Sequence, residues 1–150
     1  MTDEQKYTFS SLMTLLIESE RKLGQFYEGM RAGTDQTKLK SLMSDYAKKS
    51  LGRMEKMRKT RVETVVEMTL EPITGLNLDE LLEEFNSTAE SRRLTDFQKA
   101  MTLERTISEL YARASPKIMQ ISAETSELLT ALSRESADRC NELKQYIRSA

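Results

Sequence analysis

The sequence predicts an all-α protein, a bundle of four long helices formed by two helix hairpins with a long crossover between them. Apolar residues recur at spacings of three and four along four segments, which is typical of helices with one buried face. No segment alternates apolar and polar residues for long enough to predict a sheet. The two hairpins also share sequence matches at nearly one offset, which indicates an internal duplication.

The first helix is expected over about residues 3–32. Thr2 and Gln5 have the spacing of a capping box, in which two side chains satisfy free backbone N–H groups. Gly33 is placed to end the helix, because glycine tolerates the left-handed conformation. The predicted buried face consists of Phe9, Leu12, Met13, Leu16, Leu23, Phe26, Tyr27 and Met30.

The second helix is expected to be capped by Thr34 or Asp35 and to run to about residue 65, which gives a first hairpin over about 3–66. Its predicted buried face consists of Leu39, Leu42, Met43, Tyr46, Ala47, Ser50, Met54 and Met57.

A crossover is expected over about 67–94, between the second and third helices, because Pro72 and Gly75 interrupt the helical pattern. Asn77 and Glu80 have the spacing of a capping box and predict one short helix inside the crossover, over Leu78–Phe85.

The second hairpin is expected over about 95–148. Thr95 and Gln98 predict the start of the third helix, again by the spacing of a capping box. Ser115-Pro116 is expected to end that helix and begin the fourth, because serine caps helices and proline fits the first helical position.

Composition restricts the classes of function. The formal net charge is −1, from 23 basic and 24 acidic residues, so nothing favours nucleic acid or an anionic membrane as a partner. The chain has no histidine, which removes histidine-dependent catalysis and most zinc sites. Cys140 is the single cysteine. A single cysteine, together with the lack of a signal-peptide pattern and of a long apolar run, predicts a cytoplasmic protein.

The two hairpins match in two places. Glu20-Arg21 and Phe26-Tyr27 of the first helix align with Glu104-Arg105 and Leu110-Tyr111 of the third, at an offset of 84 residues. Ser50-Leu51-Gly52-Arg53 of the second helix aligns with Ser136-Ala137-Asp138-Arg139 of the fourth, at an offset of 86 residues. Two matches in the same order favour a duplicated hairpin.

With these motifs the chain resembles the rubrerythrin-related members of the ferritin-like superfamily. Their first and third helices carry an iron-binding glutamate six residues before a Phe-Tyr pair. Glu20 matches this pattern with Phe26-Tyr27, and Glu104 matches it with one substitution, Leu110-Tyr111. The resemblance implies a ferritin-like four-helix bundle with its crossover between helices 2 and 3.

The chain departs from the family at the Glu-x-x-His motifs of helices 2 and 4, which here read Ser50-x-x-Arg53 and Ser136-x-x-Arg139. A di-iron site needs four carboxylates and two imidazoles. Arginine cannot deprotonate to become a ligand, and its charge repels iron. The resemblance therefore implies a degenerate di-iron site, with no catalytic residue, no bound metal and no cofactor.

The central hypothesis is a buried polar cluster at the position of the former metal site. Two buried glutamates facing each other are costly, and two arginines restore neutrality and can each form a bidentate pair. The predicted members are Glu20, Arg53, Glu104, Arg139, Ser50, Ser136, Tyr27 and Tyr111. In the alternatives, the glutamates are exposed, the arginines extend to solvent, and Glu135 pairs with Arg139 within its own helix.

The expected function is that of a non-catalytic structural or interaction module. The expected oligomeric state is a homodimer, because two-fold dimers are the commonest oligomers. An unknown protein partner is a second option. One alternative is a binding protein that holds an anion or small ligand between Arg53 and Arg139. The other is a residual di-iron-type oxidoreductase that uses Glu20 and Glu104 with Glu135 or Asp45.

Overall fold

The computed structural model describes residues 7–63 and 71–149, and five helices joined by loops make up this part of the chain. The helices are α1 (Phe9–Ala32), α2 (Thr37–Glu63), α3 (Asp79–Glu90), α4 (Asp96–Ile118) and α5 (Ala123–Ser149). Within these two ranges there is no β-strand, only an isolated antiparallel bridge between Tyr7 and Ile73. The all-α prediction is confirmed.

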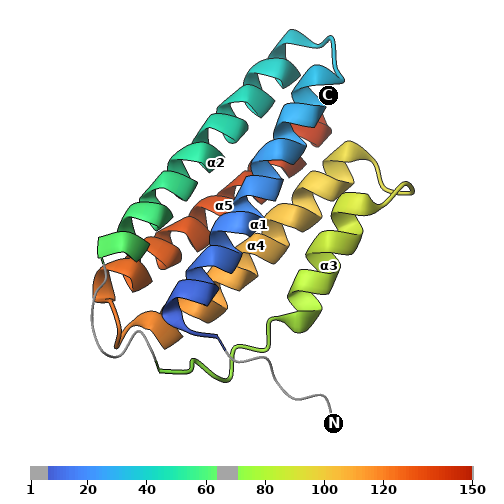
Figure 1. Ribbon diagram of the computed structural model, residues 1–150. Coiled ribbons are helices and arrows are strands. Elements are labelled where there is room, and N and C mark those ends of the chain that lie inside the picture. The colour runs from blue at the N-terminus through green and yellow to red at the C-terminus, as the bar shows by residue number, and fades with distance from the viewer. Residues whose placement is uncertain (1–6, 64–70, 150) are drawn as a thin grey trace.

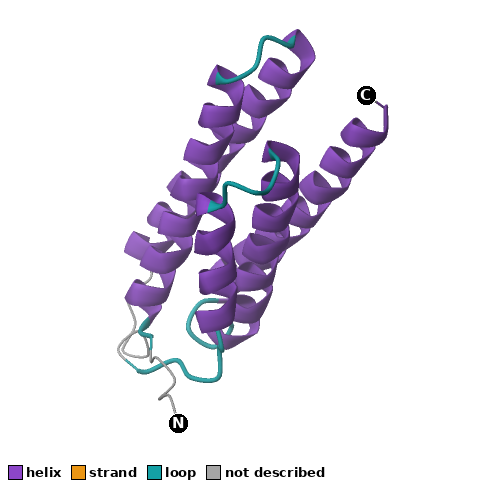
Figure 2. Cartoon of the chain, turned by 90° about the vertical axis from the view of Figure 1, so that its right-hand side faces the viewer, coloured by secondary structure: helices purple, strands orange, loops and turns teal. Residues whose placement is uncertain are grey.

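Four long helices run side by side as a bundle (Figure 1). The α1–α2 hairpin and the α4–α5 hairpin are the two most closely packed helix pairs, and α1 also contacts α4 while α2 contacts α5. The short α3 lies along the outside of the bundle against α4 (Figures 1 and 2). It belongs to the crossover between the hairpins, as the sequence predicted, although it begins later and extends to Glu90.

α1 begins later than predicted. The expected cap pair, Thr2 and Gln5, lies outside the described residues, and the N-cap is Thr8. Thr8 Oγ1 accepts from the backbone N–H of Ser11 at 3.1 Å, and Ser11 Oγ accepts from the N–H of Thr8 at 2.9 Å. The chain before the helix is extended because Tyr7 bridges to Ile73.

Gly33 ends α1, as predicted, but for a different reason. Its φ of −89° is not left-handed, and its N–H instead donates to the carbonyls of Gly29 and Met30. α2 then begins at Thr37 rather than directly after Thr34 or Asp35. Thr34 accepts from the N–H of Gln36 at 3.2 Å and so forms part of the turn.

The predicted cap of the crossover helix is wrong. Leu78 occupies the N-cap position of α3 and makes no side-chain cap bond. Asn77 has a φ of +52°, and its carbonyl accepts from the Arg113 side chain. The chain therefore turns at Asn77 so that the apolar Leu78 is buried.

The predicted boundary at Ser115-Pro116 is also wrong, whereas Thr95 and Gln98 form the predicted capping box of α4. α4 continues through Pro116 to Ile118. Ser115 does not cap a helix, because its hydroxyl bonds to the Ser126 carbonyl of α5 at 2.8 Å. The turn comes later, where Ser122 Oγ accepts from the N–H of Thr125 at 3.1 Å.

One apolar core runs through the bundle and under α3. Tyr27, Tyr46 and Tyr111 are among its largest fully buried side chains. Among the described helices, none is both long and apolar enough to cross a membrane.

Candidate functional site

Four charged side chains lie inside the bundle. Glu20 and Glu104 are 0% exposed, Arg53 is 4% exposed and Arg139 is 3% exposed. Each comes from a different long helix, on the face that also carries the apolar core. The alternatives in which these glutamates are exposed and these arginines extend to solvent are therefore wrong.

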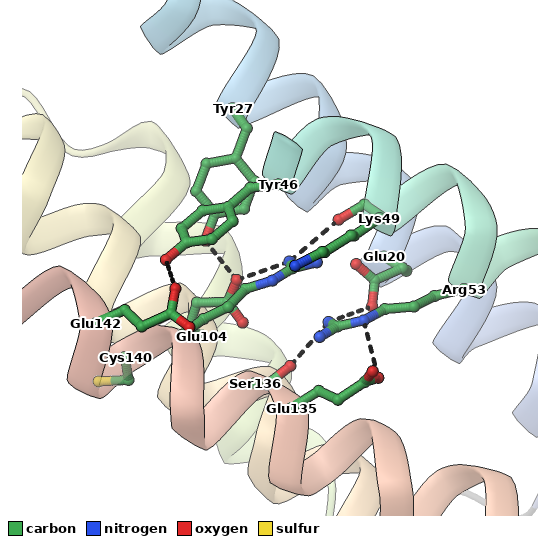
Figure 3. A network of polar contacts seen from close by, with 12 residues as sticks. Glu20, Tyr27, Tyr46, Lys49, Arg53, Glu104, Glu135, Ser136, Cys140 and Glu142 are labelled. Atoms are coloured by element: carbon green, nitrogen blue, oxygen red, sulfur yellow. Dashed lines mark hydrogen bonds and ion pairs between the residues drawn. The ribbon is translucent and has the colours of Figure 1, made fainter. Parts of the chain in front are cut away.

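The charges form two ion pairs, one in each hairpin (Figure 3). Arg53 Nη1 of α2 lies 3.2 Å from Glu20 Oε1 of α1. Arg139 Nη1 of α5 lies 3.0 Å from Glu104 Oε1 of α4. In each pair one guanidinium nitrogen contacts one carboxylate oxygen, so the expected bidentate geometry does not occur.

Two tyrosines connect the hairpins. Tyr111 of α4 donates its hydroxyl to Glu20 Oε1 of α1 at 2.6 Å. Tyr27 of α1 donates to Glu104 Oε1 of α4. Each glutamate thus receives an arginine from its own hairpin and a tyrosine from the other.

Two serines also connect the hairpins, through hydrogen bonds between α2 and α5. Arg53 Nη1 donates to Ser136 Oγ at 3.0 Å (Figure 3), and Arg139 Nη1 donates to Ser50 Oγ at 3.4 Å. All eight side chains of the predicted cluster are therefore hydrogen-bonded, in two sets of four that each combine both hairpins. One set is Glu20, Arg53, Tyr111 and Ser136, and the other is Glu104, Arg139, Tyr27 and Ser50. We call the two sets together the ion-pair network.

The surroundings of the two arginines differ. Arg53 Nε lies 3.6 Å from Glu135 Oε2, a side chain that is 58% exposed (Figure 3). The Arg139 guanidinium lies over the Tyr46 ring, 4.9 Å from its centroid, and 5.8 Å from that of Tyr27. The predicted pair between Glu135 and Arg139 is wrong, because Arg139 points into the bundle toward Glu104, whereas Glu135 lies near Arg53 of α2.

Sequence reasoning missed the part that Tyr46 has in the site. Its periodicity predicted only a buried position, which is correct, since Tyr46 is 1% exposed. Its hydroxyl donates to Glu142 Oε2 at 2.6 Å (Figure 3), and its ring face covers Arg139. The aligned position of the other hairpin is Leu132, so no repeated motif marked it.

Burial sets the electrostatics of the network. It raises the pKa of Glu104 above the usual range, and the charge of Glu20 adds to this, whereas Arg139 and the Tyr27 hydroxyl oppose it. Burial, followed by the adjacent carboxylate, raises the pKa values of Tyr27 and Tyr111 well above the usual value. Both tyrosines are therefore neutral hydrogen-bond donors.

Each buried charge of the network has an opposite charge beside it, yet three buried polar atoms make no hydrogen bond. They are Glu20 Oε2, Glu104 Oε2 and Arg139 Nη2. Removing either member of a pair would therefore leave a buried charge with few remaining partners.

The donor set does not fit a di-iron centre. The chain has no histidine, and Oε1 of each buried glutamate already accepts from a guanidinium and a tyrosine. Over residues 7–63 and 71–149, no three His, Cys, Asp or Glu side chains are grouped so as to hold a metal ion. The two additional ligands considered for residual metal binding face cations instead, Glu135 near Arg53 and Asp45 3.1 Å from Lys49.

Comparisons with protein-family models, with curated proteins and with solved structures found no match to this chain. The contacts of the ion-pair network are therefore the main guide to its function.

Proposed function

We propose that this chain is a non-catalytic, ferritin-like bundle of the rubrerythrin-related kind, in which the ion-pair network replaces a di-iron centre. Its role is that of a structural or interaction module. The observation that carries the proposal is the reciprocal exchange of contacts between the hairpins.

This exchange supports the duplication. The pair of Glu20 and Arg53 corresponds to the pair of Glu104 and Arg139, and the same atom types, Oε1 and Nη1, meet in both. The tyrosine and serine contacts repeat in the same way, at the offsets of 84 and 86 residues that the sequence contains. Two unrelated hairpins would have no reason to bury the same four residue types in the same connections.

The charges support a structural role for the site. Two carboxylates and two guanidiniums sum to zero inside the bundle, which lowers the cost of burying each of them. A metal ion would have to displace guanidiniums that are tethered by the backbone, and it would add charge to a site that is already neutral.

The same charge balance argues against an anion site between the arginines. Arg53 and Arg139 each face a carboxylate, so an anion would bring a third negative charge into the network. The tyrosine hydroxyls are also already in use, since Tyr27 and Tyr111 both donate to glutamates.

Metal analysis tests the proposal. We expect protein expressed with ample iron to be colourless, to contain far less than one iron, manganese or zinc per chain, and to lack peroxidase and ferroxidase activity. Stoichiometric iron that is lost in Glu20→Ala with Glu104→Ala would refute it.

A variant that restores the family motif is the matched positive control. Ser50→Glu with Arg53→His, and Ser136→Glu with Arg139→His, rebuild both Glu-x-x-His motifs around Glu20 and Glu104. We expect this variant to bind iron under conditions in which the natural chain does not, because six ligands then converge.

A further inference from the structure

A groove of about 470 Å³ lies between α1 and α3 on the outside of the bundle. It stays open because α3 packs against α4 and far less closely against α1 (Figure 1). Leu15 of α1 and Leu82 of α3, both partly buried, line it from its two sides. Tyr7 lines one end, and at the other end Lys22 Nζ donates to Asn86 Oδ1 at 3.3 Å. The groove therefore has apolar side chains along its middle and two defined ends.

The groove follows the axis of α1 for about three helical turns. The residues of α1 that line it begin at Ser11 and end at Lys22, a span of about 16 Å at about 1.5 Å per residue. Helices border both of its long sides. A short partner helix can lie along such a space with its apolar face inward, whereas strand addition needs a free sheet edge.

The helix on one side of this groove is strongly acidic. α3 has no basic residue, and its five acidic residues are Asp79, Glu80, Glu83, Glu84 and Glu90. Glu84 pairs with Arg105 of α4, and no ion pair joins the other four to the described part of the chain. Four exposed negative charges are thus left without a counterion from the chain itself.

Three of these carboxylates form a stripe beside the groove. Asp79, Glu83 and Glu90 recur with Asn86 at spacings of three and four, which place them on one face of α3. Because Asn86 lines the groove, this stripe follows its rim. Burial, and then the charge of Asp79, raise the pKa of Tyr7, in agreement with a position of Asp79 near the Tyr7 end.

The α1 side adds little net charge. Glu18 pairs with Arg21 of its own helix, and Lys22 stands at the end that it closes with Asn86. The charge beside the groove therefore comes mainly from α3. A nucleic acid or an anionic membrane would meet like charges there, whereas a basic partner would meet opposite ones.

We infer that the groove between α1 and α3 binds a basic amphipathic helix of a partner protein. Apolar residues of that helix, at spacings of three and four, lie against Leu15 and Leu82. Its lysines or arginines lie along Asp79, Glu83 and Glu90. This inference gives the proposed interaction role a kind of partner, and it rests on that proposed function.

Fluorescence anisotropy of three labelled synthetic peptides, titrated with the full chain, tests the inference. Each peptide has about 14 residues, which allow about four helical turns. The first has leucines at spacings of three and four and lysines along one edge, the second has glutamate in place of lysine, and the third has serine in place of leucine. We expect the first to bind at least about tenfold more tightly than either of the others, because only it matches both the charge and the apolar side chains of the groove.

A charge reversal on α3 tests whether the peptide binds at this groove. Glu83→Lys with Glu90→Lys should weaken binding of the lysine peptide about tenfold and strengthen binding of the glutamate peptide, because opposite charges become like charges. Both positions lie beyond the first turn of α3, so lysine there does not oppose the helix dipole. Glu127→Lys with Asp138→Lys, at exposed positions of α5, is the matched control, since it changes the net charge equally and should leave binding unchanged. Circular dichroism checks that each variant is folded.

Nuclear magnetic resonance of the labelled chain locates the bound peptide, and we expect chemical-shift changes at Ser19, Leu82 and Asn86. Changes confined to α2 or α5, or equal weakening by the α3 and α5 variants, would overturn the inference. So would equal binding of the serine and leucine peptides, which would indicate a charge attraction that does not use the groove.

Sedimentation of the chain alone tests the other occupant. Self-association that Glu83→Lys with Glu90→Lys abolishes would assign the groove to a second copy and would also overturn the inference. Metal analysis does not depend on the groove, so failure of peptide binding is distinguishable from failure of the proposed function.

Discussion

Breaking one ion pair of the network should destabilise the protein more than removing the whole pair. Arg53→Ala leaves Glu20, which is 0% exposed, with only the Tyr111 hydroxyl as a partner. It also removes the donor to Ser136. The double variant Glu20→Leu with Arg53→Met contains neither charge and keeps similar side-chain volumes.

The magnitudes follow from burial. Leaving one buried charge without its partner costs about 3–5 kcal/mol, a large part of a total stability of about 5–15 kcal/mol. Both variants leave Ser136 without its donor, so the double variant differs in leaving the neutral Tyr111 hydroxyl, rather than a charge, without its partner, at a cost of about 1–3 kcal/mol. We therefore expect strong coupling, with the double variant more stable than Arg53→Ala.

Urea unfolding followed by far-ultraviolet circular dichroism, at one protein concentration, measures these free energies. Arg58 and Glu55 provide the matched control on α2. Their ion pair is 3.0 Å long, but the side chains are 47% and 73% exposed. Alanine at either position should cost under about 1 kcal/mol.

Additive, near-neutral effects at Glu20 and Arg53, similar to those of the exposed pair, would refute the reasoning. Such a result would mean that these side chains reach solvent in solution and that no buried ion pair stabilises the bundle.

Two further predictions concern pH and backbone conformation. Because the folded pKa values of Tyr27 and Tyr111 are raised, their contribution to stability is complete below about pH 10 and is lost at higher pH, by up to about 1.4 kcal/mol per pH unit for each. When both tyrosines are changed to phenylalanine, the free energy of unfolding should fall less steeply as the pH rises through the alkaline range. An unchanged dependence of that free energy on pH would contradict this. Gly75→Ala should cost about 1 kcal/mol or more, because Gly75 has a φ of +77° and a Cβ there would lie 2.8 Å from Lys117 Nζ. Gly52→Ala, in the middle of α2 with open space at its Cβ, should instead stabilise by about 0.5–1 kcal/mol in the same urea assay.

The helices could be predicted because their signal is local. Periodic apolar residues indicated all four long helices and most of the buried positions, including Leu12, Leu16 and Met43. The helix ends were less predictable, because cap motifs compete with tertiary contacts. Ser115 illustrates this, since its hydroxyl bonds across to α5 and α4 continues past Pro116.

The members of the ion-pair network could also be identified from the sequence, because a repeated motif marks them twice. Glu20 and Glu104 share an offset with Tyr27 and Tyr111, and repetition on a helix's apolar face indicates an inward position. Nothing in the sequence specified which atoms would pair, and the bidentate contacts expected for Arg53 do not occur.

Only the tertiary structure decided the contacts that depend on how the hairpins pack. Tyr46 covers Arg139, and Glu135 lies near Arg53 rather than near Arg139, although neither contact belongs to a repeated motif. Helical periodicity determines which face of each helix is buried. The rotation and height of one helix against the next then decide which side chains meet, and these depend on the packing of the whole core.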